Sequence, residues 1–248
     1  MGSASPALIA VAHGSRDPRS AATVSTVVAD LALRRPGLDV HPAFLDLSTP
    51  SVGQVVDSLA ARGHTDAVVV PLLLGSAYHA RVDLPDLLAR ARSRHPGLRL
   101  TQADVLGMDI RLVTALRERV LATGADIHDT GLGIAVAAVG SSSPEANHRT
   151  RHVGRLLAAG TAWRTSVCFV TAEPGLPQAI SRLRARGCAR IVVAPWFLAP
   201  GLLTDRLITT ASDIAHAAPI GNHPLVGEVI DSRYTTAVRG LDARRMAA

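Results

Sequence analysis

An internal repeat constrains the fold of this chain more than any other feature. The segment from Arg62 to Pro71 recurs from Arg186 to Pro195, and each copy starts with Arg-Gly and ends in an apolar run closed by proline. Gly14-Ser15, followed by Pro18, recurs as Gly140-Ser141, followed by Pro144. A chain of 248 residues has room for two modest domains. We therefore predict two similar domains, at residues 1–124 and 131–248, joined by the segment 123–131, which has no hydrophobic periodicity.

Short apolar runs alternate with helical spacing along the whole chain. Val24, Val27, Val28 and Leu31, for example, follow the i, i+3, i+4, i+7 pattern of an amphipathic helix. The expected strands are 7–12, 40–45, 67–74, 98–105, 133–139, 166–171 and 190–195, and the expected later helices are 145–158, 176–186, 205–217 and 225–239. Helices between strands indicate parallel sheets. The predicted fold class is α/β, with two flavodoxin-like halves, each a four-stranded parallel sheet flanked by helices, and a cleft between them.

The charge of the chain favours an anionic partner other than nucleic acid. The formal net charge is +6, and all 26 basic residues are arginine, spread over the helical segments. Aromatic residues make up only 3% of the chain, so it lacks a platform on which bases could stack. A small polycarboxylate suits such a surface better.

The sequence also predicts a cytoplasmic protein without membrane association. Its strongest apolar run, 67–74, is too short to span a bilayer, and no basic segment precedes the first apolar run. The two cysteines, Cys168 and Cys188, lie in or beside apolar strand patterns. We expect both to be buried free thiols, as in a reducing compartment.

Three candidate functional residues lie at the carboxyl ends of expected strands in the first half. His13 ends the first strand, Asp46 closes the second, and His79 lies in the loop after the third. In the repeat, His13 corresponds to Val139 and His79 to Leu203. Ligands of open α/β sheets bind beyond these strand ends. Two imidazoles and a carboxylate suit iron, cobalt or nickel, and neutral histidine also accepts protons near pH 7. We therefore expect one active half and one supporting half.

The segments around these residues fit a flat anionic ligand. Gly14 allows close backbone approach, and the helix start that follows it and Ser15 offers free N–H groups to an anion. Arg16 offers a bidentate contact to a carboxylate, so Gly14, Ser15 and Arg16 are expected substrate contacts. The small residues Gly75, Ser76 and Ala77 leave room for a bulky planar molecule before Tyr78 and His79. Asp83 is expected to cap the next helix.

Together these segments resemble the sirohydrochlorin chelatases, a family of class II chelatases that insert a divalent metal into a tetrapyrrole. The resemblance is carried by four stretches: 13–18 (His-Gly-Ser-Arg-Asp-Pro), 44–47 (Phe-Leu-Asp-Leu), 71–79, and 83–85 (Asp-Leu-Pro). It covers the whole chain, because two-domain members carry a degenerate second copy. It implies chelatase-like halves, with His13 and His79 as the pair that handles metal and protons. Asp46 stands where several relatives place a glutamate.

The resemblance implies an enzyme that inserts Fe²⁺ or Co²⁺ into sirohydrochlorin, with metal (Fe²⁺, Co²⁺ or Ni²⁺) as substrate and no permanently bound cofactor. ATP-driven insertion is not expected, because the chain has no phosphate-binding Gly-rich loop followed by lysine. We expect a monomer. One alternative is a carrier that binds tetrapyrrole or metal without turnover. Another is a histidine-type phosphatase, which would need arginine directly before His13, where this chain has Ala12.

Overall fold

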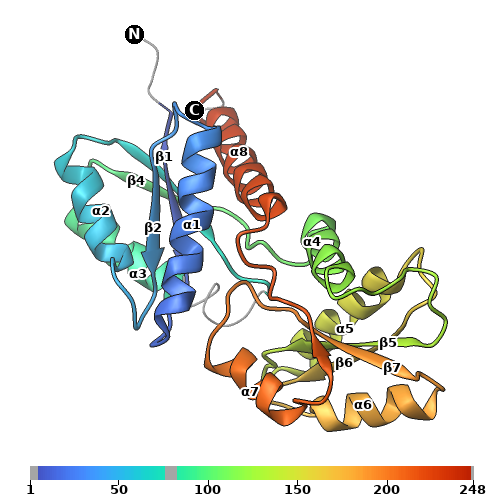
Figure 1. Cartoon of the computed structure of the whole chain (residues 1–248). Coiled ribbons are helices and arrows are strands. Elements are labelled where there is room, and N and C mark those ends of the chain that lie inside the picture. The colour runs from blue at the N-terminus through green and yellow to red at the C-terminus, as the bar shows by residue number, and fades with distance from the viewer. Residues whose placement is uncertain (1–4, 76–82, 247–248) are drawn as a thin grey trace. The chain divides into compact units, whose positions relative to one another are not determined.

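The computed structural model describes residues 5–75 and 83–246. The chain forms two compact units, each built on one four-stranded parallel sheet (Figure 1). The first unit ends at Gly107 and resumes from Pro224 to the C-terminus, and the second runs from Met108 to His223. The predicted fold class of two parallel sheets flanked by helices is confirmed.

The first sheet has the strand order β2-β1-β3-β4. The elements of this unit are β1 (Ala7–Ala12), α1 (Pro18–Arg34), β2 (Val40–Phe44), α2 (Val52–Ala61), β3 (Asp66–Pro71), α3 (Leu84–Arg94), β4 (Arg99–Gln102) and α8 (Pro224–Met246). Helices α2 and α3 cover one face of the sheet, and α1 and α8 lie side by side on the other (Figure 1). Because both faces are covered, every residue of β1 and β3 is buried, as continuous apolar runs predict.

The second sheet repeats this order as β6-β5-β7-β8. Its unit contains α4 (Ile110–Leu121), β5 (Leu132–Ala138), α5 (Pro144–Ala158), β6 (Arg164–Phe169), α6 (Leu176–Ala185), β7 (Arg190–Pro195), α7 (Leu202–Thr210) and β8 (Ala215–His216). Both cysteines are free and buried, as predicted, and burial raises the pKa of the Cys168 thiol to about 12. No helix in the described part of the chain is long and apolar enough to cross a membrane.

The two units exchange helices, so their boundaries differ from the predicted division at 124–131. Helix α4 follows the first sheet in sequence but packs on α5 and β7, whereas α8 follows the second sheet and packs on α1 and β3. Within the first unit, α8 is held by an ion pair between Arg35 and Asp231. The Tyr234 hydroxyl also donates to the Pro6 carbonyl at 2.6 Å. Amphipathic spacing shows that a helix has an apolar face, but not which sheet that face covers.

One predicted helix was wrong in its extent. The spacing predicted a helix over 205–217, but α7 ends at Thr210 and Ala215–His216 forms the edge strand β8. Ala215 and His216 pair with Val192 and Val193 of β7. This pairing with β7 overrides the local apolar spacing.

Candidate functional site

His13 and Asp46 lie together at the carboxyl edge of the first sheet. His13 directly follows β1, Asp46 follows β2, and both are exposed. The Asp46 backbone N–H donates to the His13 carbonyl at 3.0 Å, which continues the pairing of β1 with β2 by one step. An imidazole and a carboxylate therefore project from two adjacent backbone segments. The expected residues Ser76, Ala77, Tyr78 and His79 lie outside the described residues, and Gly75 is exposed just before them.

Gly14 makes this close approach possible. It has a φ of +95°, and a Cβ built on it would lie 1.7 Å from the Asp46 carbonyl oxygen. That distance is far below any van der Waals contact, and L-residues rarely adopt such a φ. The glycine predicted to permit tight backbone approach is thus needed for the contact between two loops.

Two serines hold the same loops together. The Ser48 hydroxyl accepts from the Ser15 backbone N–H at 3.1 Å and donates to the Ser15 carbonyl at 3.0 Å. The Ser15 hydroxyl in turn accepts from the Asp17 N–H at 3.0 Å. Ser15, a predicted substrate contact, therefore has an evident structural role. Sequence reasoning missed Ser48, because nothing local indicates that it reaches a loop more than 30 residues away.

Asp17 and Arg16 support the site in different ways. Asp17 caps α1 by accepting from the Arg19 N–H at 3.0 Å, and the Arg19 guanidinium also binds its carboxylate. These hydrogen bonds from Arg19 lower the pKa of Asp17. Arg16 is exposed and makes no hydrogen bond or ion pair with the described residues. An exposed guanidinium in the loop that carries His13 is available to an anionic ligand.

The predicted cap at Asp83 was wrong. Asp83 precedes α3 in the N-cap position, but its side chain accepts no capping hydrogen bond, and its φ of −65° and ψ of −46° are helical. An N-cap side chain reaches the first free N–H groups from an extended backbone, so the helical conformation at Asp83 removes that geometry.

The second unit repeats the backbone contact between the two loops but lacks the imidazole and the carboxylate. The Thr171 N–H donates to the Val139 carbonyl at 2.9 Å, as Asp46 donates to His13. Gly140, with a φ of +99°, corresponds to Gly14. Valine and threonine thus stand where the first unit has an imidazole and a carboxylate. The predicted correspondence of His13 with Val139 therefore holds in three dimensions.

Within 5–75 and 83–246, no three His, Cys, Asp or Glu side chains are grouped as in a metal site. At this edge, the described residues therefore form no group of three such ligands around His13 and Asp46. A complete metal site there needs a further ligand, and His79 is the predicted one.

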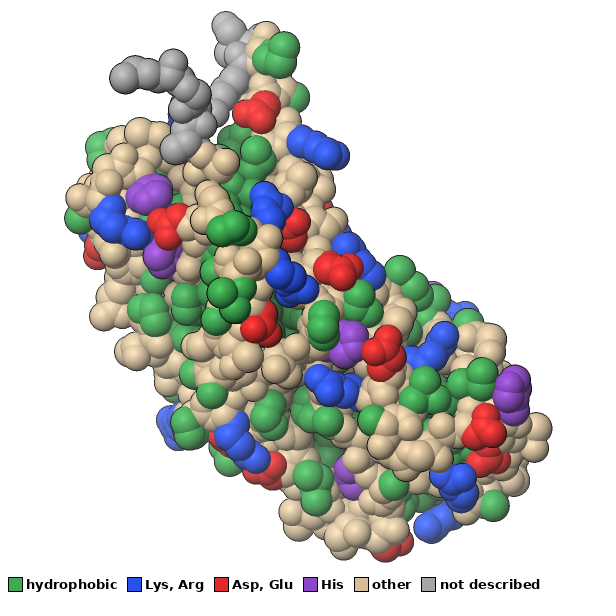
Figure 2. All heavy atoms as spheres, turned by 45° about the horizontal axis from the view of Figure 1, so that its top comes forward, with side chains coloured by type: hydrophobic (Ala, Val, Ile, Leu, Met, Phe, Trp, Pro, Cys, Tyr) green, Lys and Arg blue, Asp and Glu red, His purple; other side chains and the backbone are tan. Residues whose placement is uncertain are grey.

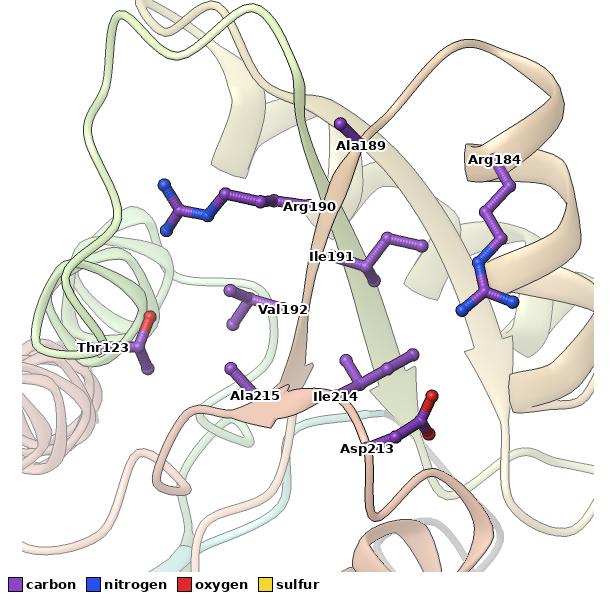
Figure 3. Close-up of a pocket in the computed structure, with 9 residues that line it drawn as sticks. All are labelled: Thr123, Arg184, Ala189, Arg190, Ile191, Val192, Asp213, Ile214 and Ala215. Carbon is purple, nitrogen blue, oxygen red and sulfur yellow. The ribbon is translucent and has the colours of Figure 1, made fainter.

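A cavity of about 320 Å³ lies elsewhere, in the second unit (Figure 3). Its lining includes Arg190, Ile191 and Val192, which are the first residues of β7. It therefore lies away from the carboxyl ends of the strands. Arg190 and Arg184 extend on opposite sides of β7 and do not converge on one point (Figure 3). This cavity has no set of convergent polar groups typical of a ligand site.

The charges are mixed on the one face of the molecule that Figure 2 shows. On the face shown in Figure 2, arginines and acidic residues alternate, and no continuous basic patch appears. This face has no basic stripe of the kind typical of nucleic-acid-binding domains.

Comparison with known proteins connects both halves of the chain to one family. The CbiX family model matches residues 7–123 and 133–237. A sirohydrochlorin ferrochelatase of Priestia megaterium is 27% identical over 242 residues, which covers 93% of this chain and 90% of the relative. A sirohydrochlorin cobaltochelatase of the same organism is 29% identical over 246 residues, covering 93% and 79% of the two chains.

A solved structure supports the fold. SirB from Bacillus subtilis, determined with Fe³⁺, superimposes with a TM-score of 0.84 at 22% identity and covers 96% of this chain and 98% of SirB. At that identity the likeness shows the shared fold of two parallel sheets. Because the family model matches both halves of the repeat, the chain belongs to the CbiX family of sirohydrochlorin chelatases, in its two-domain form.

Proposed function

We propose that this protein inserts Fe²⁺ or Co²⁺ into sirohydrochlorin without ATP. The activities of its relatives support this function, because the similarity spans 93% of this chain and 90% and 79% of the two relatives. One structural observation in this chain itself supports the proposal. The exposed residues His13 and Asp46 are joined at the carboxyl edge of the first sheet, and the matching edge of the second sheet has Val139 and Thr171.

In this proposal, His13 and His79 bind the incoming ion and Asp46 adds a carboxylate ligand. Four metal–nitrogen bonds to the macrocycle replace the bonds to these protein ligands, and two pyrrole N–H protons leave the macrocycle. The two imidazoles accept these protons once their nitrogens have released the ion to the macrocycle, a role that suits a group that titrates near neutral pH. The metal is a substrate and leaves with the product.

The macrocycle would be bound by Gly14, Ser15, Arg16 and the segment 75–78. Arg16 is suited to a peripheral carboxylate of the tetrapyrrole, because it is exposed and has no partner among the described residues. A single chain carries both halves of the repeat, so we infer that a monomer is sufficient for activity. The metal used depends on supply as well as affinity, since His and carboxylate ligands accept iron, cobalt and nickel.

The test is anaerobic insertion of Fe²⁺, Co²⁺ and Ni²⁺ into sirohydrochlorin, followed by the absorbance of the metallated product. The double variant His13→Ala/His79→Ala should lose insertion while its thermal midpoint stays within a few degrees of the wild type. His128→Ala, which removes an exposed histidine in the second unit, is the matched control and should keep full activity. Unchanged insertion by the double variant would reject these roles. Stoichiometric binding without turnover by the wild type would identify a carrier instead.

A further inference from the structure

Leu47 lies in a strained turn beside the candidate metal ligands. The Ser48 N–H donates to the Asp46 carbonyl at 2.8 Å, so a γ-turn closes around Leu47. Leu47 has a φ of +59° and is the one non-glycine residue with positive φ in the described part of the chain. A γ-turn with positive φ at its centre is rare and strained.

Neighbouring hydrogen bonds hold this turn in place. The Leu47 N–H donates to the Asp46 carboxylate at 2.8 Å, and the Asp46 N–H is bonded to the His13 carbonyl. On the other side, Ser48 is fixed to Ser15 by its hydroxyl. The turn cannot relax without breaking the contact between the two loops that carry His13 and Asp46.

Folding stability does not explain a leucine at this position. Its side chain is 49% exposed and is not part of the apolar cluster between the sheet and helices α2 and α3, whereas Leu45 packs against that cluster. Glycine or asparagine would adopt the positive φ at lower cost. The second unit, which lacks the imidazole and the carboxylate, has Ala172 after Thr171, and its φ is not positive. The strained, exposed leucine therefore occurs only beside His13 and Asp46.

We propose that Leu47 is a substrate-positioning residue that packs against the apolar face of the tetrapyrrole ring. The inference rests on the proposed function, since it needs a flat apolar ligand at this edge of the sheet. Strain that persists at an exposed apolar residue is typical of ligand contacts. Leu47 directly follows Asp46, so a ring resting on it lies next to the carboxylate. In this arrangement, Arg16 binds a carboxylate at the periphery of the macrocycle, and Leu47 packs against the face of the ring.

The experiment compares Leu47→Asn with Leu47→Met. Asparagine tolerates the positive φ but removes the apolar contact, whereas methionine keeps an apolar side chain of similar size. We expect Leu47→Asn to raise the KM for sirohydrochlorin about tenfold, the effect of losing part of a leucine contact. Its KM for the metal ion should stay unchanged, and its thermal midpoint unchanged or higher. Leu47→Met should keep a KM within about twofold of the wild type.

Leu33→Asn is the matched control, because Leu33 is an even more exposed leucine on α1 (81%) away from the edge. Its KM for sirohydrochlorin should not change. An unchanged KM in Leu47→Asn, or a rise accompanied by a fall in thermal midpoint, would overturn the proposal. Equilibrium binding of metal-free sirohydrochlorin is measured in parallel. If the wild type binds the macrocycle but does not turn over, the proposed function fails, and the binding constants of the Leu47 variants still decide this inference.

Discussion

The carbonyl oxygen of Asp46 occupies the space in which any residue other than glycine at position 14 would place its Cβ. The loops after β1 and β2 are therefore in direct backbone contact, and the two Ser15–Ser48 hydrogen bonds hold them together. The positions of His13 and Asp46 depend on this contact more than on either loop alone. Several consequences of substitution follow from it.

Gly14→Ala should separate the two loops. The added Cβ cannot remain 1.7 Å from the Asp46 oxygen, so the loops must move and metal insertion should be lost. The clash of the new Cβ and the positive φ at this position together should lower the free energy of unfolding by about 2–4 kcal/mol. Gly63→Ala is the control, because Gly63 has a φ of +80° but open space around its Cβ position. It should cost only about 1–2 kcal/mol in urea unfolding and keep its activity. Full activity in Gly14→Ala would contradict the role of the contact.

Ser48→Ala removes both hydrogen bonds to Ser15. We expect insertion activity to fall at least about tenfold, with a stability loss of about 1–3 kcal/mol. Ser51→Ala removes the hydroxyl that caps α2 in the same loop, where it accepts from the Gln54 N–H. That variant should lose about 1 kcal/mol but keep its activity. If both variants reduce activity equally, the Ser48 effect reflects general loosening of the loop.

Asp17 should contribute to the acid sensitivity of the fold. Hydrogen bonds from Arg19 lower its pKa in the native state, so the unfolded chain binds the proton first as the pH falls. The stabilisation that ionised Asp17 gives the native state is therefore complete above the ordinary aspartate pKa. It is lost as the pH drops through that value toward the lowered pKa of Asp17 in the native state. Asp17→Asn keeps a capping oxygen but cannot titrate, so its thermal midpoint should change less than that of the wild type between pH 6 and about pH 3. Arg19→Leu should flatten the profile in part, because it removes the guanidinium but keeps the backbone N–H bond. Identical profiles for wild type and variants would contradict the assignment.

Tyr234 holds the exchanged helix α8 to the first unit. It is 3% exposed, and its hydroxyl donates to the Pro6 carbonyl. Tyr234→Phe should lower the free energy of unfolding by about 1 kcal/mol through loss of that bond. Tyr234→Ala should lower it by about 3–5 kcal/mol, because it also leaves a cavity. Both effects are read from urea unfolding. Equal losses in the two variants would mean that the ring contributes no packing energy.

Several elements of the site were predictable from sequence because they depend on local pattern. The apolar runs locate β1 and β3, which are buried on both faces, and the ends of β1 and β2 place His13 and Asp46 at one edge. The repeat identified Val139 as the counterpart of His13. The Asp17 cap was also predictable, because capping involves residues only a few positions apart. At Asp83 the same rule failed, since the backbone there is helical.

Sequence alone thus determined the fold class, the doubling of the sheet and the half of the chain that carries the candidate site. Only the tertiary structure decided that α4 and α8 are exchanged, that β8 replaces the end of a predicted helix, and that Leu47 is held at a positive φ. The physical reason is the range of the interactions. Hydrophobic periodicity shows which face of a segment is apolar, but the element that covers this face depends on residues far away in the chain. The strain at a loop residue likewise depends on hydrogen bonds from distant residues.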